Sequence, residues 1–181
     1  TMKVTKLLGY QVLDSRGRPT VAASITLEDG TTHTARVPSG ASTGKHEALE
    51  LRDGDQLAHN SFYGALSVTK AVENVNTRIA PLIVGQQVDL NFIDGEIRTI
   101  DTTSNFSSLG ANATLAVSLA AAKASAHAHN VSLARYFQPQ GNLLIPMPMV
   151  NILSGGAHAN RSLDFQDVLI VPTGASSFTE A

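Results

Sequence analysis

The residues with the clearest potential for chemistry lie in one loop, residues 37–47, which reads Val-Pro-Ser-Gly-Ala-Ser-Thr-Gly-Lys-His-Glu. Its proline and two glycines let the backbone turn sharply and approach a ligand closely. The hydroxyl and backbone amide groups between Gly40 and Gly44 suit an oxyanion or a hard metal ion. A nucleotide-binding P-loop is excluded, because three residues rather than four separate these glycines, and His46 rather than Ser or Thr follows Lys45. A plain glycine- and serine-rich surface turn is the alternative.

A second group of polar residues follows an apolar run near the end of the sequence. The loop 154–160, Ser-Gly-Gly-Ala-His-Ala-Asn, carries His158, whose imidazole titrates near neutral pH. Gln166 and Asp167 come next, on a predicted strand, and adjacent strand residues point to opposite faces. From the residues alone, a solvated histidine and two polar strand residues are the simpler interpretation.

The composition limits the classes of protein to consider. The chain has 181 residues, 43% hydrophobic and 15% charged, enough for one domain, or one domain and part of another, with a buried core. Its net charge of −2 gives no reason to expect a nucleic acid or an acidic membrane as partner. The absence of cysteine excludes disulfides and Cys-ligated zinc. Without a signal-peptide run, and with polar residues interrupting the apolar stretch 111–128, we expect no membrane span and a cytoplasmic location.

Three strands that would position the first loop follow from the hydrophobic pattern. They are predicted at residues 3–13, 21–27 and 31–37, and period-2 alternation marks the second. Asp29-Gly30 supplies a two-residue hairpin turn between the last two strands. This antiparallel meander delivers the 37–47 loop at its exit.

Helical periodicity follows the meander. A first helix is predicted from Val68 to Ile79, with Pro81 ending the pattern, and a second at 89–100, with Asp89 as its N-cap. A third is predicted in the Ala-rich stretch that begins at residue 111, with Leu115 and Leu119 on one face. A short fourth helix is predicted at 132–137, with Ser132 as its N-cap. A polar loop fills residues 101–108. Strands followed by helices, unmixed, are typical of the α+β class.

The pattern changes again near residue 140. The near-continuous apolar run 143–153 is typical of a strand covered on both faces. A second strand is predicted at 165–171. Ser176 or Ser177 could cap a helix whose first turn ends the sequence, and we do not expect a native terminus there.

Taken together, these segments resemble the enolase family, the phosphopyruvate hydratases of glycolysis. The matching stretches run in family order along almost the whole chain: 14–17 with 19–21, 37–44 with 46–50 and 52–55, 109–113, and 146–149 through 155–156, 158–159 and 166. Several motifs in register are far more specific than any one of them. The resemblance implies an α+β N-terminal capping domain at residues 1–140, followed at 141–181 by the first strands of a β/α (TIM-like) barrel.

The resemblance also implies an activity. In the family, the complete enzyme dehydrates 2-phospho-D-glycerate to phosphoenolpyruvate: a barrel lysine removes the C2 proton, a glutamic acid helps the C3 hydroxyl leave, and Mg²⁺ stabilises the dianionic intermediate. By position, Ser42 matches a ligand of the second Mg²⁺ and Ala41 lies against the substrate. His158 matches a histidine on a loop that reaches the substrate, Gln166 matches a substrate-binding glutamine, and Asp167 replaces an essential glutamate near the general acid. A phosphorylated small-molecule substrate and a homo-oligomer are implied as partners.

The sequence departs from the family pattern at several positions, as expected of a diverged member. Asp167 is one methylene shorter than glutamate, and misplacement of a reacting group by about 1 Å can cost roughly a hundredfold in rate. Ala22 stands where the family has an acid used in dimer ion pairing, which leaves the family dimer contacts open. The family's primary metal carboxylates, general acid and catalytic lysine lie further along the barrel than these 181 residues, so this stretch alone is expected to be inactive. Two alternatives stay open: a paralogue that eliminates water from a related phosphonate or phosphorylated hydroxy acid, and a non-catalytic binding or scaffold protein on the same fold.

Overall fold

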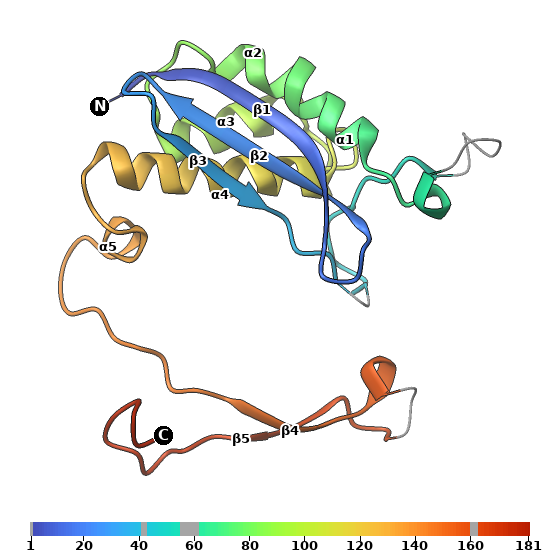
Figure 1. Cartoon of the computed structure of the whole chain (residues 1–181), viewed down its shortest axis with the longest axis vertical. Coiled ribbons are helices and arrows are strands. Elements are labelled where there is room, and N and C mark those ends of the chain that lie inside the picture. Colours follow the sequence, from blue (N-terminus) through green and yellow to red (C-terminus); the bar gives the residue numbers. More distant parts are fainter. Residues whose placement is uncertain (1, 41–42, 55–61, 160–162) are drawn as a thin grey trace. The chain divides into compact units, whose positions relative to one another are not determined.

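A computed structural model describes residues 2–40, 43–54, 62–159 and 163–181. The chain divides into two compact units, residues 1–39 with 45–139 and residues 140–181 with 40–44. The first holds a sheet and its covering helices, and the second holds a two-stranded ribbon (Figure 1).

The first unit begins with the predicted antiparallel meander. Its strands are β1 (Val4–Leu13), β2 (Pro19–Leu27) and β3 (Thr32–Arg36), in the order β1-β2-β3. Ala23 in the central strand lies opposite Gly9 on one side and Ala35 on the other. The predicted core face of β2 is confirmed, since Val21, Ala23, Ile25 and Leu27 are all buried, but Ala22 on the alternate face is buried as well, so the period-2 alternation holds only for the second half of the strand.

The turn between β2 and β3 differs from the predicted two-residue type. The register leaves three residues, 28–30, between Leu27 and Thr31, and the Leu27 N–H donates to the Thr31 carbonyl at 2.9 Å. Gly30 has φ +83°, the left-handed conformation that closes a three-residue loop. The Asp29 carboxylate accepts the Thr31 N–H at 2.9 Å, which stabilises the turn. The third strand therefore begins at Thr32, one residue later than predicted.

The helical elements follow. The helical run 69–83 and the Ala-rich helix 111–128 pack against the sheet, and the helix 90–100 packs on the Ala-rich helix (Figure 1). In order, the helical elements are η2 (Phe62–Ala65), α1 (Thr69–Asn74), the π-helical turn η3 (Val75–Ile79), α2 (Ala80–Ile83), α3 (Leu90–Ile100), α4 (Ala111–Ala128) and α5 (Leu133–Phe137). The predicted caps at Asp89 and Ser132 are confirmed, whereas no helix follows Ser177 in the described residues. The Asp89 carboxylate accepts the Phe92 N–H at 2.8 Å, and the Ser132 hydroxyl accepts the Arg135 N–H at 3.2 Å.

Pro81 does not end the first helical run as predicted, because helical structure continues to Ile83. The wide π-turn η3 separates Pro81 from α1, so the proline falls in the first turn of a new helical segment. Proline is tolerated there, since the N–H that it lacks would have no helical partner.

The Ala-rich helix α4 packs on β2 and β3 through its alanines rather than its leucines. Ala113, Ala116 and Ala120 are fully buried, whereas Leu115 and Leu119 are 42% and 38% exposed. Small side chains bring the helix axis close to the sheet. The predicted helix is confirmed, and its alanines form the buried face, whereas the face with Leu115 and Leu119 is partly exposed.

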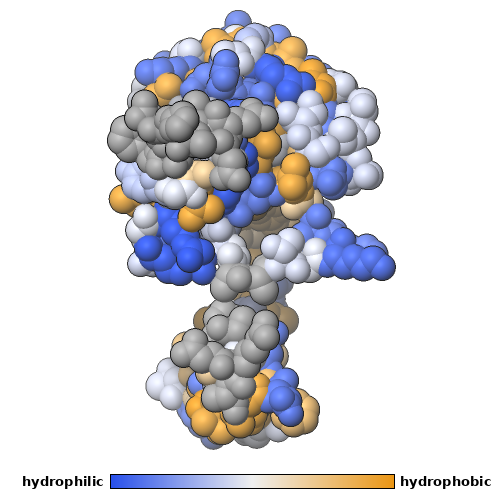
Figure 2. All heavy atoms as spheres, turned by 90° about the vertical axis from the view of Figure 1, so that its right-hand side faces the viewer, coloured by the Kyte–Doolittle hydropathy of each residue, from blue (hydrophilic) through white to orange (hydrophobic). Residues whose placement is uncertain are grey.

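The second unit contains β4 (Val150–Ser154), the 3₁₀ turn η4 (Gly156–Ala159) and β5 (Asp167–Ile170). The two strands pair antiparallel, with Val150 opposite Ile170. The predicted strand 143–153 is shorter than expected, because Pro146 and Pro148 cannot donate ladder hydrogen bonds. Both strands are exposed along their length, so the predicted covering of both faces is not found within this unit (Figure 2).

Where the chain is described, none of its helices combines the length and the apolar character needed to cross a bilayer.

Candidate active site

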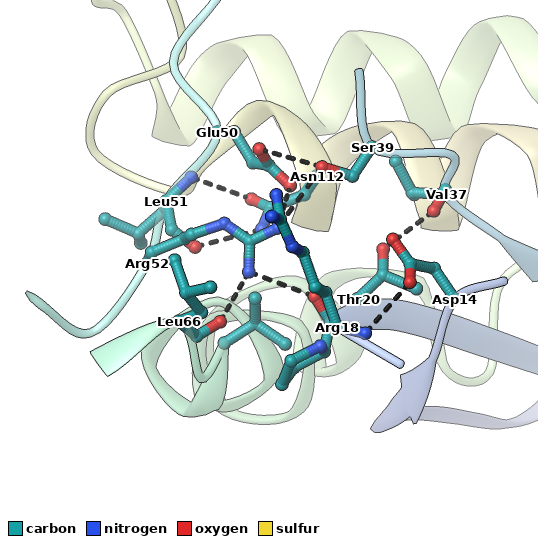
Figure 3. Close-up of polar contacts among 12 residues, drawn as sticks. Asp14, Arg18, Thr20, Val37, Ser39, Glu50, Leu51, Arg52, Leu66 and Asn112 are labelled. Atoms are coloured by element: carbon teal, nitrogen blue, oxygen red, sulfur yellow. Dashed lines mark hydrogen bonds and ion pairs between the residues drawn. The ribbon is translucent and has the colours of Figure 1, made fainter. Parts of the chain in front are cut away.

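The approach to the first predicted site, where β3 leaves the sheet, is fixed by hydrogen bonds. The Val37 N–H donates to the Val21 carbonyl at 3.0 Å, and the buried Thr20 hydroxyl donates to the Val37 carbonyl at 2.7 Å (Figure 3). Arg16 donates from Nη2 to the Ser39 carbonyl at 2.5 Å. Hydrogen bonds therefore fix the chain at Val37 and Ser39, just before Gly40.

The segment that follows the loop is fixed by the N-terminus of α4. Asn112 clamps Leu51 with both ends of its amide: Oδ1 accepts the Leu51 N–H at 3.1 Å and Nδ2 donates to the Leu51 carbonyl at 2.9 Å (Figure 3). The Ala111 N–H donates to the Leu49 carbonyl at 2.7 Å. Gly110 has φ +95°, and a Cβ there would lie 2.5 Å from Leu51 Cβ. The Gly-Ala-Asn motif thus permits a close approach that a larger residue at position 110 would prevent.

A buried carboxylate, Asp53, anchors the same segment to α1. It accepts hydrogen bonds from the N–H groups of Thr69 and Lys70, both at 3.0 Å, and from the Thr69 hydroxyl at 2.5 Å. Burial opposes ionisation of Asp53, but these hydrogen bonds outweigh it and hold the pKa of the carboxyl below its usual value. Asp53 therefore caps α1 from a distant part of the sequence.

Arg52 joins the two ends of the loop. Its Nη1 donates to the Pro19 carbonyl at 3.0 Å and to the Leu66 carbonyl. Its Nη2 lies 2.7 Å from Glu50 Oε1 and 3.3 Å from Ser39 Oγ (Figure 3). The sequence matches included residues 39, 50 and 52 without indicating this contact. Paired charges two residues apart just after a glycine-rich loop are the signal that could have suggested it.

Ala41 and Ser42, the predicted substrate-contacting and metal-binding residues of this loop, lie outside the described residues. The described structure defines where the loop begins and ends.

Asp167, the predicted catalytic carboxylate of the second unit, is the first residue of β5. Its Oδ1 accepts hydrogen bonds from Asn151 Nδ2 at 2.8 Å and Ser154 Oγ at 3.3 Å, and Asn151 Nδ2 also donates to Ser154 Oγ at 2.7 Å. Both partners come from β4, where the register brings Ser154 opposite Asp167. Sequence reasoning missed Asn151 and Ser154, because their role depends on strand pairing rather than on spacing along the chain.

Gly155 and Gly156 bring the backbone of η4 close to the chain that leads into β5. The Gly155 N–H donates to the Gln166 carbonyl at 2.6 Å, and a Cβ on Gly155 would lie 2.1 Å from the Phe165 carbonyl oxygen. Gly156 has φ +56°, and a Cβ there would lie 3.7 Å from Gln166 Cα. Because His158 belongs to η4, the structure brings the backbone of His158, Gln166 and Asp167 to one end of the β4–β5 ribbon.

Magnesium is the ion to test against these residues. Where the chain is described, no group of three or more His, Asp or Glu side chains is placed to hold a metal. The Ser42 hydroxyl, outside that part, is a hard oxygen donor of the kind Mg²⁺ accepts. The Ser42 hydroxyl therefore has the chemistry to contribute one ligand to such an ion.

Family models match nearly the whole chain, in order. Residues 4–137 match the enolase N-terminal domain, and residues 142–181 match the enolase C-terminal TIM barrel domain. The first match alone covers the meander, all the helices of the first unit and both anchors of the loop. The chain therefore belongs to the enolase family, a family of lyases.

Proposed function

We propose that this chain contributes to a Mg²⁺-dependent phosphopyruvate hydratase, which dehydrates 2-phospho-D-glycerate to phosphoenolpyruvate. The observation that supports this most is the match of both enolase domain models in their family order. The proposal includes an N-terminal capping domain at residues 1–140, the start of the barrel domain at 141–181, a cytoplasmic location and a homo-oligomeric state.

In this proposal the loop residues act by binding and positioning. Ser42 is a ligand to Mg²⁺, and Ala41 lies against the substrate. When bound, the ion neutralises the charge that develops on the substrate carboxylate as the adjacent proton leaves. The hydrogen bonds to Val37 and Ser39 on one side, and to Leu49 and Leu51 on the other, support the role by holding both ends of the loop.

The second unit supplies polar groups for the substrate. Asn151 and Ser154 hold one oxygen of the Asp167 carboxylate, and Oδ2 is left without a partner among the described residues. We propose that Asp167 holds or moves a proton near the leaving hydroxyl, with His158 and Gln166 contacting the substrate. This assignment requires the general acid and the catalytic lysine of the complete enzyme.

The test is formation of phosphoenolpyruvate by the complete native protein, followed by ultraviolet absorbance with and without Mg²⁺. We expect turnover that depends on Mg²⁺ and falls by about tenfold or more in Ser42→Ala, as expected for loss of a metal contact. Ser107→Ala, in the 101–108 loop, is the matched control and should retain activity. Absence of Mg²⁺-dependent turnover would overturn the proposal.

One residue favours a second candidate, a paralogue that acts on a related phosphonate or phosphorylated hydroxy acid. Asp167 is shorter than the glutamate of the family, which sets its carboxylate further from any substrate seated as in the family. If Asp167→Glu raises turnover of 2-phosphoglycerate while lowering turnover of a phosphonate analogue, the paralogue is favoured.

A further inference from the structure

The side chain of Arg52 is a mostly buried charge, 18% exposed, that contacts Glu50 in its own segment and three other segments of the first unit. It reaches the start of β2 through the Pro19 carbonyl and the chain before α1 through the Leu66 carbonyl. It also contacts Glu50 and Ser39 on the two sides of the loop. A guanidinium can make this set of contacts because it presents five N–H donors in a rigid planar fork.

Ser39, the last residue before Gly40, is held through its backbone and its side chain. Its carbonyl accepts from Arg16, and its hydroxyl donates to Glu50 Oε2 at 3.3 Å and accepts from Arg52 Nη2 at 3.3 Å. Ser39, Glu50 and Arg52 therefore form a closed triangle at the base of the loop (Figure 3).

Arg16 is itself fixed before it reaches Ser39. The Asp14 carboxylate accepts the backbone N–H groups of Arg16 at 2.8 Å and Arg18 at 2.9 Å, and its other oxygen lies 3.7 Å from Arg16 Nε. The triangle is thus connected, through Arg16 and the Ser39 carbonyl, to a turn at residues 14–18 that is stabilised by its own hydrogen bonds.

We propose that Arg52, with Glu50, is a positioning residue that fixes the base of the 40–47 loop and so sets how tightly the loop binds its ligand. The assignment of that ligand as Mg²⁺ rests on the proposed function. The physical reason is preorganisation: a loop whose ends are already fixed loses less conformational entropy when it binds. The contacts also fix where the chain departs toward its ligating residues, on which binding geometry depends.

A purely structural role is the competing explanation, since Arg52 also ties two backbone carbonyls together. Arg78 offers a matched comparison. It donates to the carbonyls of Ser108 at 3.1 Å and Ile100 at 3.2 Å, and to the Ser108 hydroxyl at 3.1 Å from each Nη. It therefore clamps backbone in the same unit in the same way, at a different loop.

The first experiment needs no enzymatic activity. Trypsin cleavage after Lys45, which is exposed, is timed in the complete native protein and in Arg52→Lys, Glu50→Gln and Arg78→Lys. Lysine keeps the charge but loses the fork. We expect cleavage to accelerate several-fold in the Arg52 and Glu50 variants and to match the native rate in Arg78→Lys at equal thermal stability. Equal acceleration in all three variants would overturn the proposal, because it would indicate general loosening.

The second experiment measures the Mg²⁺ concentration for half-maximal turnover. We expect Arg52→Lys to raise it by about tenfold, the low end of what partners of metal ligands contribute, with a smaller change in kcat and none in Arg78→Lys. An unchanged Mg²⁺ requirement in Arg52→Lys would overturn the link to the ligand. If the cleavage rates behave as expected but no protein shows Mg²⁺-dependent turnover, the proposed function fails and the positioning of the loop by Arg52 stands.

Discussion

At the scale of single residues, the carboxylate of Asp167 depends on a neighbour from the other strand. Asn151 Nδ2 lies 2.8 Å from Asp167 Oδ1 and also contacts Ser154. With Asp167 in its proposed role, we expect Asn151→Ala to lower kcat/KM of the complete enzyme by about tenfold to a hundredfold, because a reacting carboxylate without this support moves from its productive position. Asn142→Ala, an exposed asparagine of the same unit, is the control. Equal kcat/KM values for the two variants would contradict the role of Asn151.

A histidine pair makes the contact between the β2–β3 turn and α4 sensitive to pH. His127 Nε2 lies 2.9 Å from Asp29 Oδ2, and the rings of His33 and His127 are 4.8 Å apart. Burial, and next the charge of His127, hold the pKa of His33 below its usual 6.5. The Thr31 hydroxyl, and next His127, lower the pKa of Asp29 to about 2. The charged groups that face His33 are thus Asp29, His127 and Lys123.

The sign of the His33 effect follows from linkage. The unfolded chain protonates His33 near pH 6.5 while the folded chain resists it, so its contribution to stability is present above that pH and is lost as the pH falls. We expect the melting temperature to decline less between pH 7 and pH 5 in His33→Gln than in the native chain. The measurement is thermal unfolding across this range, and parallel declines in the two proteins would exclude His33 as the cause.

At the scale of elements, β1 and the π-turn η3 require a glycine where they cross. A Cβ on Gly9 would lie 2.7 Å from Val75 Cβ, and the Asn76 amide bonds both the N–H and the carbonyl of Gly9, at 2.8 and 2.9 Å. We expect Gly9→Ala to destabilise the first unit by about 1–3 kcal/mol through overpacking. That Cβ would also lie 2.8 Å from Val75 Cγ1 and 3.3 Å from Cγ2, so Val75→Ala, which removes both methyl groups, should recover part of that loss. Chemical denaturation of both single variants and the double variant measures the coupling, and strictly additive effects would mean that the crossing is not the source of strain.

These elements also show which parts of the fold could be predicted from the sequence alone. The strands of the meander and the caps at Asp89 and Ser132 are local, because spacing and residue type determine them within a few positions. The contacts of Asn76, Asn112 and Asp53 could not be predicted, since each joins residues from different elements. The same holds for the candidate site: the loop was found from its composition, whereas the contacts that hold it depend on the folded chain.

At the scale of the whole molecule, the two units differ in how their apolar side chains are covered. The first unit buries a continuous core between the sheet and its helices. In the second, Leu144 and Phe165 are 86% and 78% exposed, and a two-stranded ribbon alone is marginally stable in water. Apolar surface of this extent marks a site of contact with further protein, which agrees with a barrel domain model matching this part of the chain.

Besides its apolar core, the first unit is stabilised by the buried carboxylates of Asp53 and Asp101, and acid should reveal their contribution. Asp101 is 3% exposed and accepts the N–H groups of Leu109 at 2.7 Å and Thr103 at 3.1 Å, and the Thr103 hydroxyl at 2.5 Å. Burial raises its pKa, but these hydrogen bonds outweigh burial and place the pKa below the usual 3.8. Its contribution is therefore present above about pH 4 and is lost as the pH falls further.

Replacement of this carboxylate tests the argument. Asp101→Asn keeps the shape of the side chain but loses the charge and leaves one N–H of the 101–109 loop facing an amide donor. We expect a loss of about 1–3 kcal/mol in the free energy of unfolding at pH 7, and a difference from the native chain that shrinks as the pH falls from 4 toward 2. Urea denaturation at a series of pH values measures both. Asp94→Asn, on the neighbouring helix α3, is the control. A native-minus-variant difference that stays constant down to pH 2 would show that the Asp101 charge does not stabilise the fold, because protonation would then cost the native chain nothing.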